Sequence, residues 1–181
     1  KTGLKGKPHA EYNAIKSSKG RLKGSKIYVS LEPCTHYGKT PPCVKNIIKS
    51  KIKEVIFSIE DIDKRTKSKS YKIFRDNNIK VRSGVLLKKA KKIYQSYIYN
   101  KNKNLPFVTG KMSISKDNFI YSKQKKRITN YHSDNVSHLL RYKNDSILIT
   151  GKTANIDNPK LDCRIKGLSN HSPIRIILDR S

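Results

Sequence analysis

S-L-E-P-C-T-H-Y-G-K-T-P-P-C, residues 30–43, decides the fold, and P-H-A-E at residues 8–11 is its upstream partner. Together they contain His9, Cys34 and Cys43, and zinc prefers nitrogen and sulfur ligands in a tetrahedral arrangement. No fourth Cys or His completes the set, because the remaining cysteine and histidines lie far along the chain or inside other patterns. Catalytic zinc sites leave the fourth position to water. The pattern therefore predicts a catalytic zinc site with these three residues as ligands.

Glu11 follows His9 by two residues, at the expected start of a helix. An H-x-E pattern followed by P-C and a second Cys is the signature of zinc-dependent base deaminases, in which the glutamate moves protons and does not bind the metal. Zinc lowers the pKa of its water to about 7, which gives a hydroxide nucleophile for a ring carbon that carries an amino group. A carboxylate must then deliver the proton of that water to the ring nitrogen and to the departing ammonia. We predict that Glu11 is this acid and base.

Each part of the pattern is weak alone, since scattered His and Cys residues more often lie in a core or on a surface. The combination is specific. Glu-Pro-Cys at 32–34 follows a strand-like run, and Pro-Pro-Cys at 41–43 opens a helix-like run. A cysteine at a helix N-terminus feels the positive end of the helix dipole, which favours the thiolate that zinc requires. We interpret the pattern as a zinc deaminase site.

The chain has 181 residues, enough for one domain or for one domain and part of another. It begins at Lys1 and its one methionine is Met112, so we expect a fragment of a longer translation product. No apolar run is long enough to predict a membrane span, and no secretory signal is present. Three cysteines, two of them in a metal pattern, favour a reducing cytoplasm over a disulfide framework.

The charge is strongly positive, with 41 Lys+Arg against 13 Asp+Glu and a formal net charge of +28. Such a charge raises the hypothesis of a nucleic-acid partner. The lysines, however, are spread along the chain among Asn, Ile, Ser and Tyr and form no single basic tail. We therefore favour a compositional drift over a nucleic-acid footprint. A positive surface would also suit phosphorylated substrates and a phosphate-rich cofactor.

Strands and helices are expected to alternate along the chain, which predicts an α/β fold with a mostly parallel sheet and helices on both faces. In the first part we expect strands at 26–31, 54–59 and 79–82, and helices at 9–19, from Pro41 onwards, at 71–76 and at 86–100. In the second part we expect strands at 106–114, 145–149 and 173–178, and a helix at 129–142 with Val136, Leu139 and Leu140 facing inward. Sites in such sheets lie beyond the carboxyl ends of strands, where Cys34 falls. We predict domains at 1–100 and 105–181, joined by a linker at 101–104.

H-A-E-Y-N-A-I and the 30–43 stretch resemble the deaminase half of the bifunctional riboflavin-biosynthesis deaminase–reductase family (diaminohydroxyphosphoribosylaminopyrimidine deaminase / 5-amino-6-(5-phosphoribosylamino)uracil reductase). Cytidine and tRNA adenosine deaminases usually have two residues between their cysteines, whereas eight intervene here. The resemblance implies a cytidine-deaminase-like three-layer αβα domain. It also implies that His36 and Lys39, in the insert, contact the ribose phosphate of the substrate.

The second part resembles the opening half of the same family's reductase domain, which implies a dihydrofolate-reductase-like α/β fold and NADPH. The matching runs include P-F-V-T-G-K-M-S-I-S-K-D, S-I-L-I-T-G-K-T-A-N-I-D-N-P-K-L-D-C-R and P-I-R-I-I-L-D. By position, the residues implied to contact NADPH are Ser113, Thr153 and Asp157. Those implied to hold the phosphoribosyl substrate are Arg141, Leu161 and Arg164. Arginine suits the second role because it binds phosphate bidentately and keeps its charge.

The chain departs from the family pattern in several places. Ser115, Lys116, Asp117 and Asn118 stand where the family has Leu-Asp-Gly, Arg127 replaces an aromatic expected against the cofactor, and Arg180 stands where a small residue is common. The loop at 60–70 lacks the family's Asp-Pro-Asn-Pro. We expect the first helix and hairpin of the deaminase, and the glycine-rich cofactor turn of the reductase, to be missing. We therefore expect no hydride transfer from these 181 residues alone.

The resemblance implies a role in riboflavin biosynthesis: zinc-dependent hydrolytic deamination of 2,5-diamino-6-(5-phosphoribosylamino)pyrimidin-4-one. In the complete protein, NADPH-dependent reduction of the ribosyl group would follow. A homo-oligomer in the cytoplasm is expected, with a small-molecule substrate and no membrane or nucleic-acid partner. Two alternatives stay open. One is a nucleoside or tRNA base deaminase with the same zinc ligands, and the other is a zinc-stabilised basic nucleic-acid-binding module.

Overall fold

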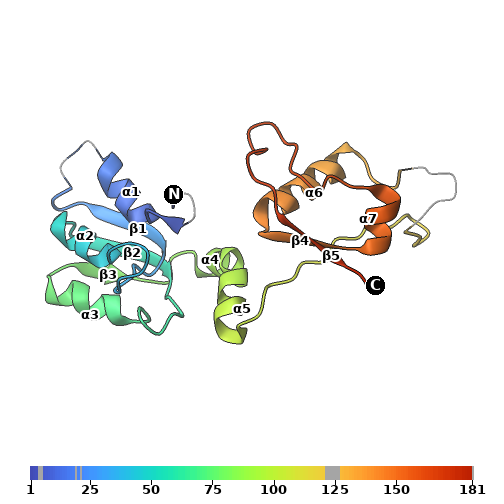
Figure 1. Ribbon diagram of the computed structural model, residues 1–181. Helices are drawn as coiled ribbons and strands as arrows, with labels where there is room; N and C mark the ends of the chain where they lie inside the picture. The colour runs from blue at the N-terminus through green and yellow to red at the C-terminus, as the bar shows by residue number, and fades with distance from the viewer. Residues whose placement is uncertain (4–5, 19, 21, 121–126, 181) are drawn as a thin grey trace. The chain divides into compact units, whose positions relative to one another are not determined.

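The computed structural model describes residues 1–3, 6–18, 20, 22–120 and 127–180. The chain forms two compact units, residues 1–108 and residues 109–181, which we describe separately (Figure 1). No helix among the described residues has both the length and the apolar character needed to cross a membrane.

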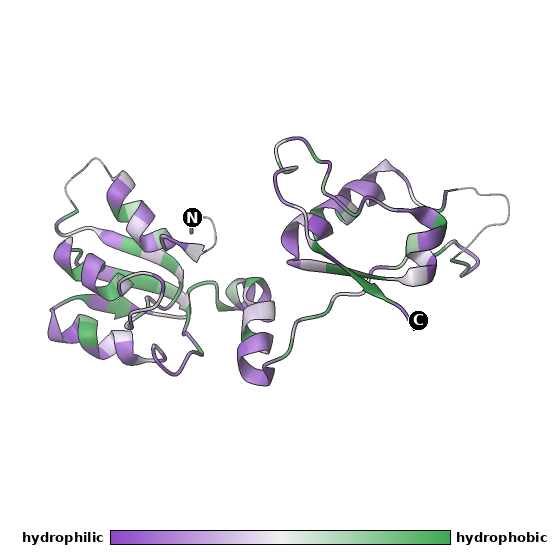
Figure 2. Cartoon of the chain, viewed as in Figure 1, coloured by the Kyte–Doolittle hydropathy of each residue, from purple (hydrophilic) through white to green (hydrophobic). Residues whose placement is uncertain are grey.

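The first unit is built on a parallel sheet in which β2 lies between β1 and β3. The strands are β1 (Lys26–Leu31), β2 (Glu54–Ile59) and β3 (Lys80–Arg82), which confirms the predicted parallel arrangement. Val55, Ile56 and Phe57 of the central strand are each at most 1% exposed. A parallel strand covered on both faces reads as a continuous apolar run, and β2 carries the hydrophobic colour along most of its length (Figure 2).

The helices α1 (Ala10–Ser17), α2 (Cys43–Lys49) and α3 (Lys69–Asp76) occur where the sequence predicts them, although Lys19, the predicted end of α1, lies outside the described residues. The core that they form with the sheet has members from all three helices and all three strands. Side chains alternate across a strand, so Val55 and Phe57 share this core face while Ile56 points to the opposite face. The helix α4 (Leu87–Ile93) contacts β2.

The helix predicted at 86–100 is two helices, α4 and α5 (Gln95–Lys103). They meet at Tyr94, whose backbone (φ −92°, ψ 11°) leaves the helical region. The break directs the Tyr94 and Tyr97 hydroxyls to Ser30 and Asp61, at the ends of two strands. The predicted linker at 101–104 is the last turn of α5 and its C-cap, Asn104. The boundary between the two units falls later, after Val108.

The second unit contains α6 (Tyr131–Lys143), β4 (Ser146–Thr150), α7 (Gly151–Asp157) and β5 (Ile174–Leu178), with β4 and β5 parallel. The helix α7 was not predicted, although Thr150 provides a recognisable N-cap signal by accepting a hydrogen bond from the Thr153 amide. The strand predicted at 106–114 is wrong, because these residues are irregular. Within the described part of this unit β4 and β5 pair only with each other, so residues 106–114 have no strand to pair with. The prediction that Val136 faces inward is also wrong, since it is 56% exposed.

Candidate zinc and active site

His9, Cys34 and Cys43 come from three separate segments and meet in the first unit. His9 is the N-cap of α1, Cys34 follows β1, and Cys43 is the first residue of α2. Their ligand atoms, His9 Nδ1 and the two Sγ atoms, lie within 4.8 Å of one another. The location beyond the carboxyl end of β1 is where parallel α/β sheets carry their sites.

The separations match the requirements of a zinc ion. His9 Nδ1 lies 3.5 Å from Cys34 Sγ and 3.3 Å from Cys43 Sγ. Tetrahedral zinc with bonds of about 2.3 Å to sulfur and 2.0–2.1 Å to nitrogen places a sulfur and a nitrogen ligand about 3.5 Å apart. The backbone N–H of Cys43 also donates to Cys34 Sγ at 3.3 Å, as it would to a thiolate. The residues present therefore fit a zinc ion.

The two thiols influence each other's ionisation. The hydrogen bond from Cys43 lowers the pKa of Cys34 to about 6, against the effect of burial, and the His9 charge acts in the same direction. The pKa of Cys43 is raised far above its ordinary value by that same hydrogen bond, by burial and by the charge of Glu11. The Cys34 thiol thus loses its proton easily, whereas the Cys43 thiol keeps its proton. A divalent cation supplies the counter-charge that both thiolates need.

Glu11 is the second residue of α1, in the first turn of the helix, and its side chain is partly buried. Its negative charge contributes to raising the pKa of the Cys43 thiol, so the carboxylate lies within electrostatic reach of the cysteine pair. The sequence predicted a carboxylate next to the three ligands. The electrostatic effect of Glu11 on Cys43 agrees with that prediction, and the role of Glu11 in proton transfer stays a prediction.

His36 and Lys39 lie in the insert between the cysteines. His36 is partly buried, and its Nδ1 lies 3.0 Å from the Thr66 hydroxyl, whereas Lys39 is exposed. Thr40, also in the insert, was not predicted as a site residue. Its hydroxyl is buried and has no hydrogen-bond partner among the described residues. A buried hydroxyl without a partner is uncommon in folded proteins, so Thr40 is a candidate for contact with a ligand.

Glu32 is the main site feature that the sequence did not reveal. Its side chain is 2% exposed, and it accepts hydrogen bonds from the backbone amides of Asp61, Ser68 and Ser70 and from the Ser70 hydroxyl. A buried carboxylate is stable only when its oxygens are well hydrogen-bonded. The sequence shows Glu32 beside Cys34 in the Glu-Pro-Cys motif. Its hydrogen-bond partners, however, lie 29 to 38 residues away, so the sequence does not reveal them.

The loop from 60 to 68, between β2 and α3, is also held from α5. The Tyr97 hydroxyl donates to Asp61 at 2.7 Å, and Lys101 Nζ lies 2.9 Å from Asp63. Arg65 binds Asp63 through both its Nε and its Nη2 atoms. The hydrogen bonds from Arg65 and Lys101 hold the pKa of the Asp63 carboxyl well below its usual range.

We predict that Asp63→Asn destabilises this loop at neutral pH by about 1 kcal/mol, the scale of exposed ion pairs. Because the pKa of Asp63 is depressed by folding, its stabilisation is fully present above the unfolded pKa of about 4 and is lost as the pH falls through the folded value. The difference between the wild type and the variant should therefore shrink in acid. Hydrogen exchange of peptides from residues 60–70, at pH 7 and pH 3, measures this. An equal difference at both pH values would contradict the prediction.

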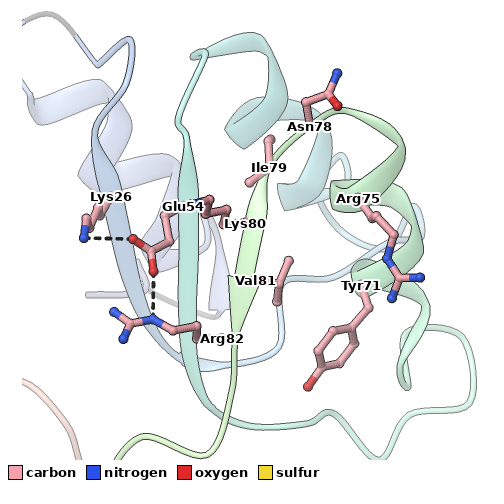
Figure 3. A pocket seen from close by; sticks show the side chains of 9 residues that line it. All are labelled: Lys26, Glu54, Tyr71, Arg75, Asn78, Ile79, Lys80, Val81 and Arg82. Carbon is pink, nitrogen blue, oxygen red and sulfur yellow. Dashed lines mark ion pairs between the residues drawn. The ribbon is translucent and has the colours of Figure 1, made fainter.

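A depression of 820 Å³ lies at the opposite end of the same sheet and contains none of the three metal-binding candidates (Figure 3). There Glu54 is paired with Lys26 at 2.9 Å and with Arg82 at 2.7 Å. Lys26 and Glu54 are the first residues of β1 and β2, whereas Cys34 follows the last residue of β1. Glu54 balances only part of the charge of this depression, because Lys26, Arg75, Lys80 and Arg82 also line it.

In the second unit the structure brings together two of the three residues implied to bind the phosphoribosyl group. Arg141 Nη1 lies 3.2 Å from His138 Nδ1, and the backbone amide of Arg164 donates to the same nitrogen at 3.3 Å. Leu161, three residues before Arg164, is 7% exposed. His138, which the sequence did not single out, therefore organises this cluster. The signal was present as a helical i, i+3 spacing from His138 to Arg141.

The three residues implied to contact NADPH are more scattered. Thr153 and Asp157 lie one turn apart on α7, where the Thr153 amide donates to the hydroxyl of the N-cap residue Thr150. Ser113 lies in an irregular segment and accepts a hydrogen bond from Lys111 at 2.7 Å. No hydrogen bond joins Ser113 to either α7 residue within the described chain. Arg127, which stands where the family has an aromatic residue, binds Asp134 in the first turn of α6. Residues 124–126, which precede it, lie outside the described residues.

Comparison with known proteins agrees with this site. The family described as "Cytidine and deoxycytidylate deaminase zinc-binding region" matches residues 1–59, which include His9, Glu11, Cys34 and Cys43. Riboflavin biosynthesis protein RibD of Bacillus amyloliquefaciens is 35% identical over 176 residues, covering 96% of this chain and 47% of that protein. RibD of Aquifex aeolicus is 34% identical over 176 residues, with 96% and 49% covered.

Solved structures extend the similarity over both units. A diaminohydroxyphosphoribosylaminopyrimidine deaminase/5-amino-6-(5-phosphoribosylamino)uracil reductase from Thermotoga maritima matches with a TM-score of 0.88 at 37% identity, covering 97% of this chain and 51% of that chain. RibD of Acinetobacter baumannii matches with a TM-score of 0.83 at 29% identity, with 96% and 51% covered. The chain thus spans about half the length of the relatives that it matches.

The fold and the ligand cluster define a zinc-binding α/β protein of the cytidine deaminase class. The similarity over nearly the whole chain gives the more specific assignment. Over nearly its whole length the chain is similar to the riboflavin-biosynthesis deaminase–reductase family.

Proposed function

We propose that residues 1–100 catalyse the hydrolytic deamination of 2,5-diamino-6-(5-phosphoribosylamino)pyrimidin-4-one in riboflavin biosynthesis. One observation carries the proposal: three ligand atoms of the right kinds lie within 4.8 Å of one another beside a carboxylate. His9, Cys34 and Cys43 would hold zinc. When bound, zinc supplies a water molecule with a pKa near 7.

Glu11 performs the proton transfers. Deamination consumes one water, replaces the ring amino group by a carbonyl oxygen and releases ammonia. Glu11 takes one proton from the water and delivers it to the ring nitrogen, and it then transfers the second proton of that water to the amino group, which leaves as ammonia. His9 is held at the N-cap and Glu11 in the first turn of the same helix, so α1 fixes their spacing.

The insert between the cysteines provides the substrate contacts. His36, which is partly buried, and Lys39, exposed at the surface, supply donors for the phosphoribosyl group. A compact ammonium on a flexible chain suits a phosphate as a point charge. The Thr40 hydroxyl, which has no hydrogen-bond partner in the part of the chain that the structure describes, offers a further donor.

The second domain, 105–181, is proposed to belong to the NADPH-dependent reductase of the whole protein. Arg141, Leu161 and Arg164 would hold the phosphoribosyl product, and Ser113, Thr153 and Asp157 would contact NADPH. The Arg141 guanidinium and the Arg164 backbone amide both contact His138 Nδ1, which brings these two residues of the first set together. We further propose that the whole protein acts in the cytoplasm as a homo-oligomer.

An ammonia-release assay tests the deaminase proposal. With zinc-loaded protein, kcat/KM for the phosphoribosylated diaminopyrimidinone should exceed that for cytidine or for a tRNA anticodon stem-loop by at least about 100-fold, because buried polar groups reject substrates that leave them unpaired. A preference for either of the other two substrates would favour a nucleoside or tRNA deaminase. Tight salt-dependent RNA binding without ammonia release would favour the nucleic-acid-binding alternative.

A further inference from the structure

His36 has a partner that lies outside the insert and outside the metal cluster. The partner is Thr66, in the loop at 60–68, whose hydroxyl lies 3.0 Å from His36 Nδ1. Thr66 is completely buried. A buried hydroxyl needs a hydrogen-bond partner, so this contact fixes both the threonine rotamer and the plane of the imidazole.

The second ring nitrogen of His36 lies on the far side of the ring from Thr66. A Cβ placed on Gly38 would lie 3.8 Å from His36 Nε2, so this nitrogen lies over the backbone of the insert. With Nδ1 committed to Thr66, Nε2 is the nitrogen left for a ligand. The orientation of the ring therefore decides what Nε2 can reach.

Thr66 is itself held in place by hydrogen bonds on both sides. Glu32 accepts from the amides of Asp61 and Ser68, which bracket Thr66 in the loop, at 3.1 Å each. Closer to Thr66, the Thr35 hydroxyl donates to the Arg65 carbonyl at 2.8 Å. The loop at 60–68 is thus locked to the segment that carries Cys34 and His36, and Thr66 has little freedom to move away from the imidazole.

We propose that Thr66 is a positioning residue that aims His36 Nε2 at the phosphoribosyl group of the substrate, with Glu32 fixing the loop that carries it. The inference rests on the proposed function for the identity of the substrate. Thr66 touches His36 and not the reacting atoms, so it governs substrate affinity and not the proton transfers of Glu11. The affinity for a ligand without the phosphoribosyl group should not depend on Thr66.

The matched variants are Thr66→Val, which keeps the shape and removes the hydroxyl, and Thr66→Ser, which keeps the hydroxyl. In zinc-loaded protein, T66V should raise KM for the phosphoribosylated substrate by about 10-fold, the effect of one lost hydrogen bond to a positioned group. Its kcat should stay within about twofold and its zinc content should be unchanged. T66S should restore the wild-type KM to within about twofold. An equal fall of kcat in T66V and T66S would indicate a merely structural role and overturn the proposal.

A double-mutant cycle tests whether Thr66 acts through His36. His36→Ala should raise KM, and adding T66V to H36A should raise it no further, because the two changes remove the same interaction. If T66V raises KM by the same factor in the presence and absence of His36, the two residues act independently and the proposal fails.

A binding measurement separates this proposal from the proposed function. Calorimetric titration with ribose 5-phosphate should give a Kd about 10-fold weaker for T66V than for the wild type and for T66S. If the three proteins show these relative Kd values but the wild type releases no ammonia, the deaminase assignment fails and the role of Thr66 stands. If the wild type releases ammonia and T66V leaves both KM and Kd unchanged, the role of Thr66 fails alone. A wild type that neither binds ribose 5-phosphate nor releases ammonia overturns both.

Discussion

Replacing Glu11 by glutamine is expected to lower kcat for ammonia release by at least about 100-fold and to leave zinc bound. General acid–base catalysis contributes roughly 10²–10⁴-fold, and a neutral amide cannot accept the proton that a carboxylate accepts. Glutamine has nearly the same shape, so the first turn of α1 should be preserved. The measurements are steady-state ammonia release and zinc content by mass spectrometry.

Retention of zinc in the Glu11→Gln variant has a specific electrostatic reason. The charge of Glu11 contributes to raising the pKa of Cys43, after the larger effects of Cys34 and burial. Removing that charge lowers the cost of forming the Cys43 thiolate, which favours the ligated form. A variant that loses both zinc and activity would indicate that Glu11 is a structural or ligating residue.

Glu54→Gln is the matched control for Glu11→Gln. The Glu54→Gln change also removes one negative charge, but Glu54 lies at the opposite end of the sheet and pairs with Lys26 and Arg82 (Figure 3). Ammonia release should stay within about twofold of the wild type, since breaking exposed ion pairs costs little stability. A similar loss of activity in both variants would point to a general effect of charge and would sink the assigned role of Glu11.

Replacing Cys43 by alanine is expected to abolish zinc binding and ammonia release together. Cys43 is 1% exposed and begins α2, so its Sγ is held by the first turn of that helix, and alanine leaves no ligand atom there. The two remaining ligands, His9 and Cys34, are fewer than the three that catalytic zinc sites use. Zinc content should fall from about one equivalent to near zero.

Metal removal gives the Cys43→Ala prediction a thermodynamic readout. A ligand that binds only the folded state stabilises it by about 2.7 kcal/mol at 100 times its Kd. A chelator should therefore lower the melting temperature of the wild type and have no effect on the variant. A variant that still responds to the chelator would show that zinc binds elsewhere.

Cys163→Ala is the control for the loss of a buried thiol. Cys163 is 2% exposed, close to the value for Cys43, and lies in the second unit. The cavity cost should be similar, whereas zinc content and the response to a chelator should match those of the wild type. Loss of zinc in this variant would contradict the ligand set.

The second unit shows the limit of sequence prediction most clearly. The helix at 131–143 and the strands at 146–150 and 174–178 lie close to their predicted bounds, because their periodicity is local. The run at 106–114 also contains β-branched and aromatic residues but forms no strand. A strand requires a partner for its backbone groups, and composition does not say whether one is present.

The sequence alone determined the three candidate zinc ligands, the neighbouring glutamate and the parallel order of strands in the first unit. These features follow from short spacings and from hydrophobic patterns within single elements. The tertiary structure alone decided the burial of Glu32, the break at Tyr94 and the contact between Thr66 and His36. These depend on hydrogen bonds between residues about 30 or more positions apart, such as His36 and Thr66, and such pairs become neighbours only when the sheet brings the carboxyl ends of β1 and β2 together.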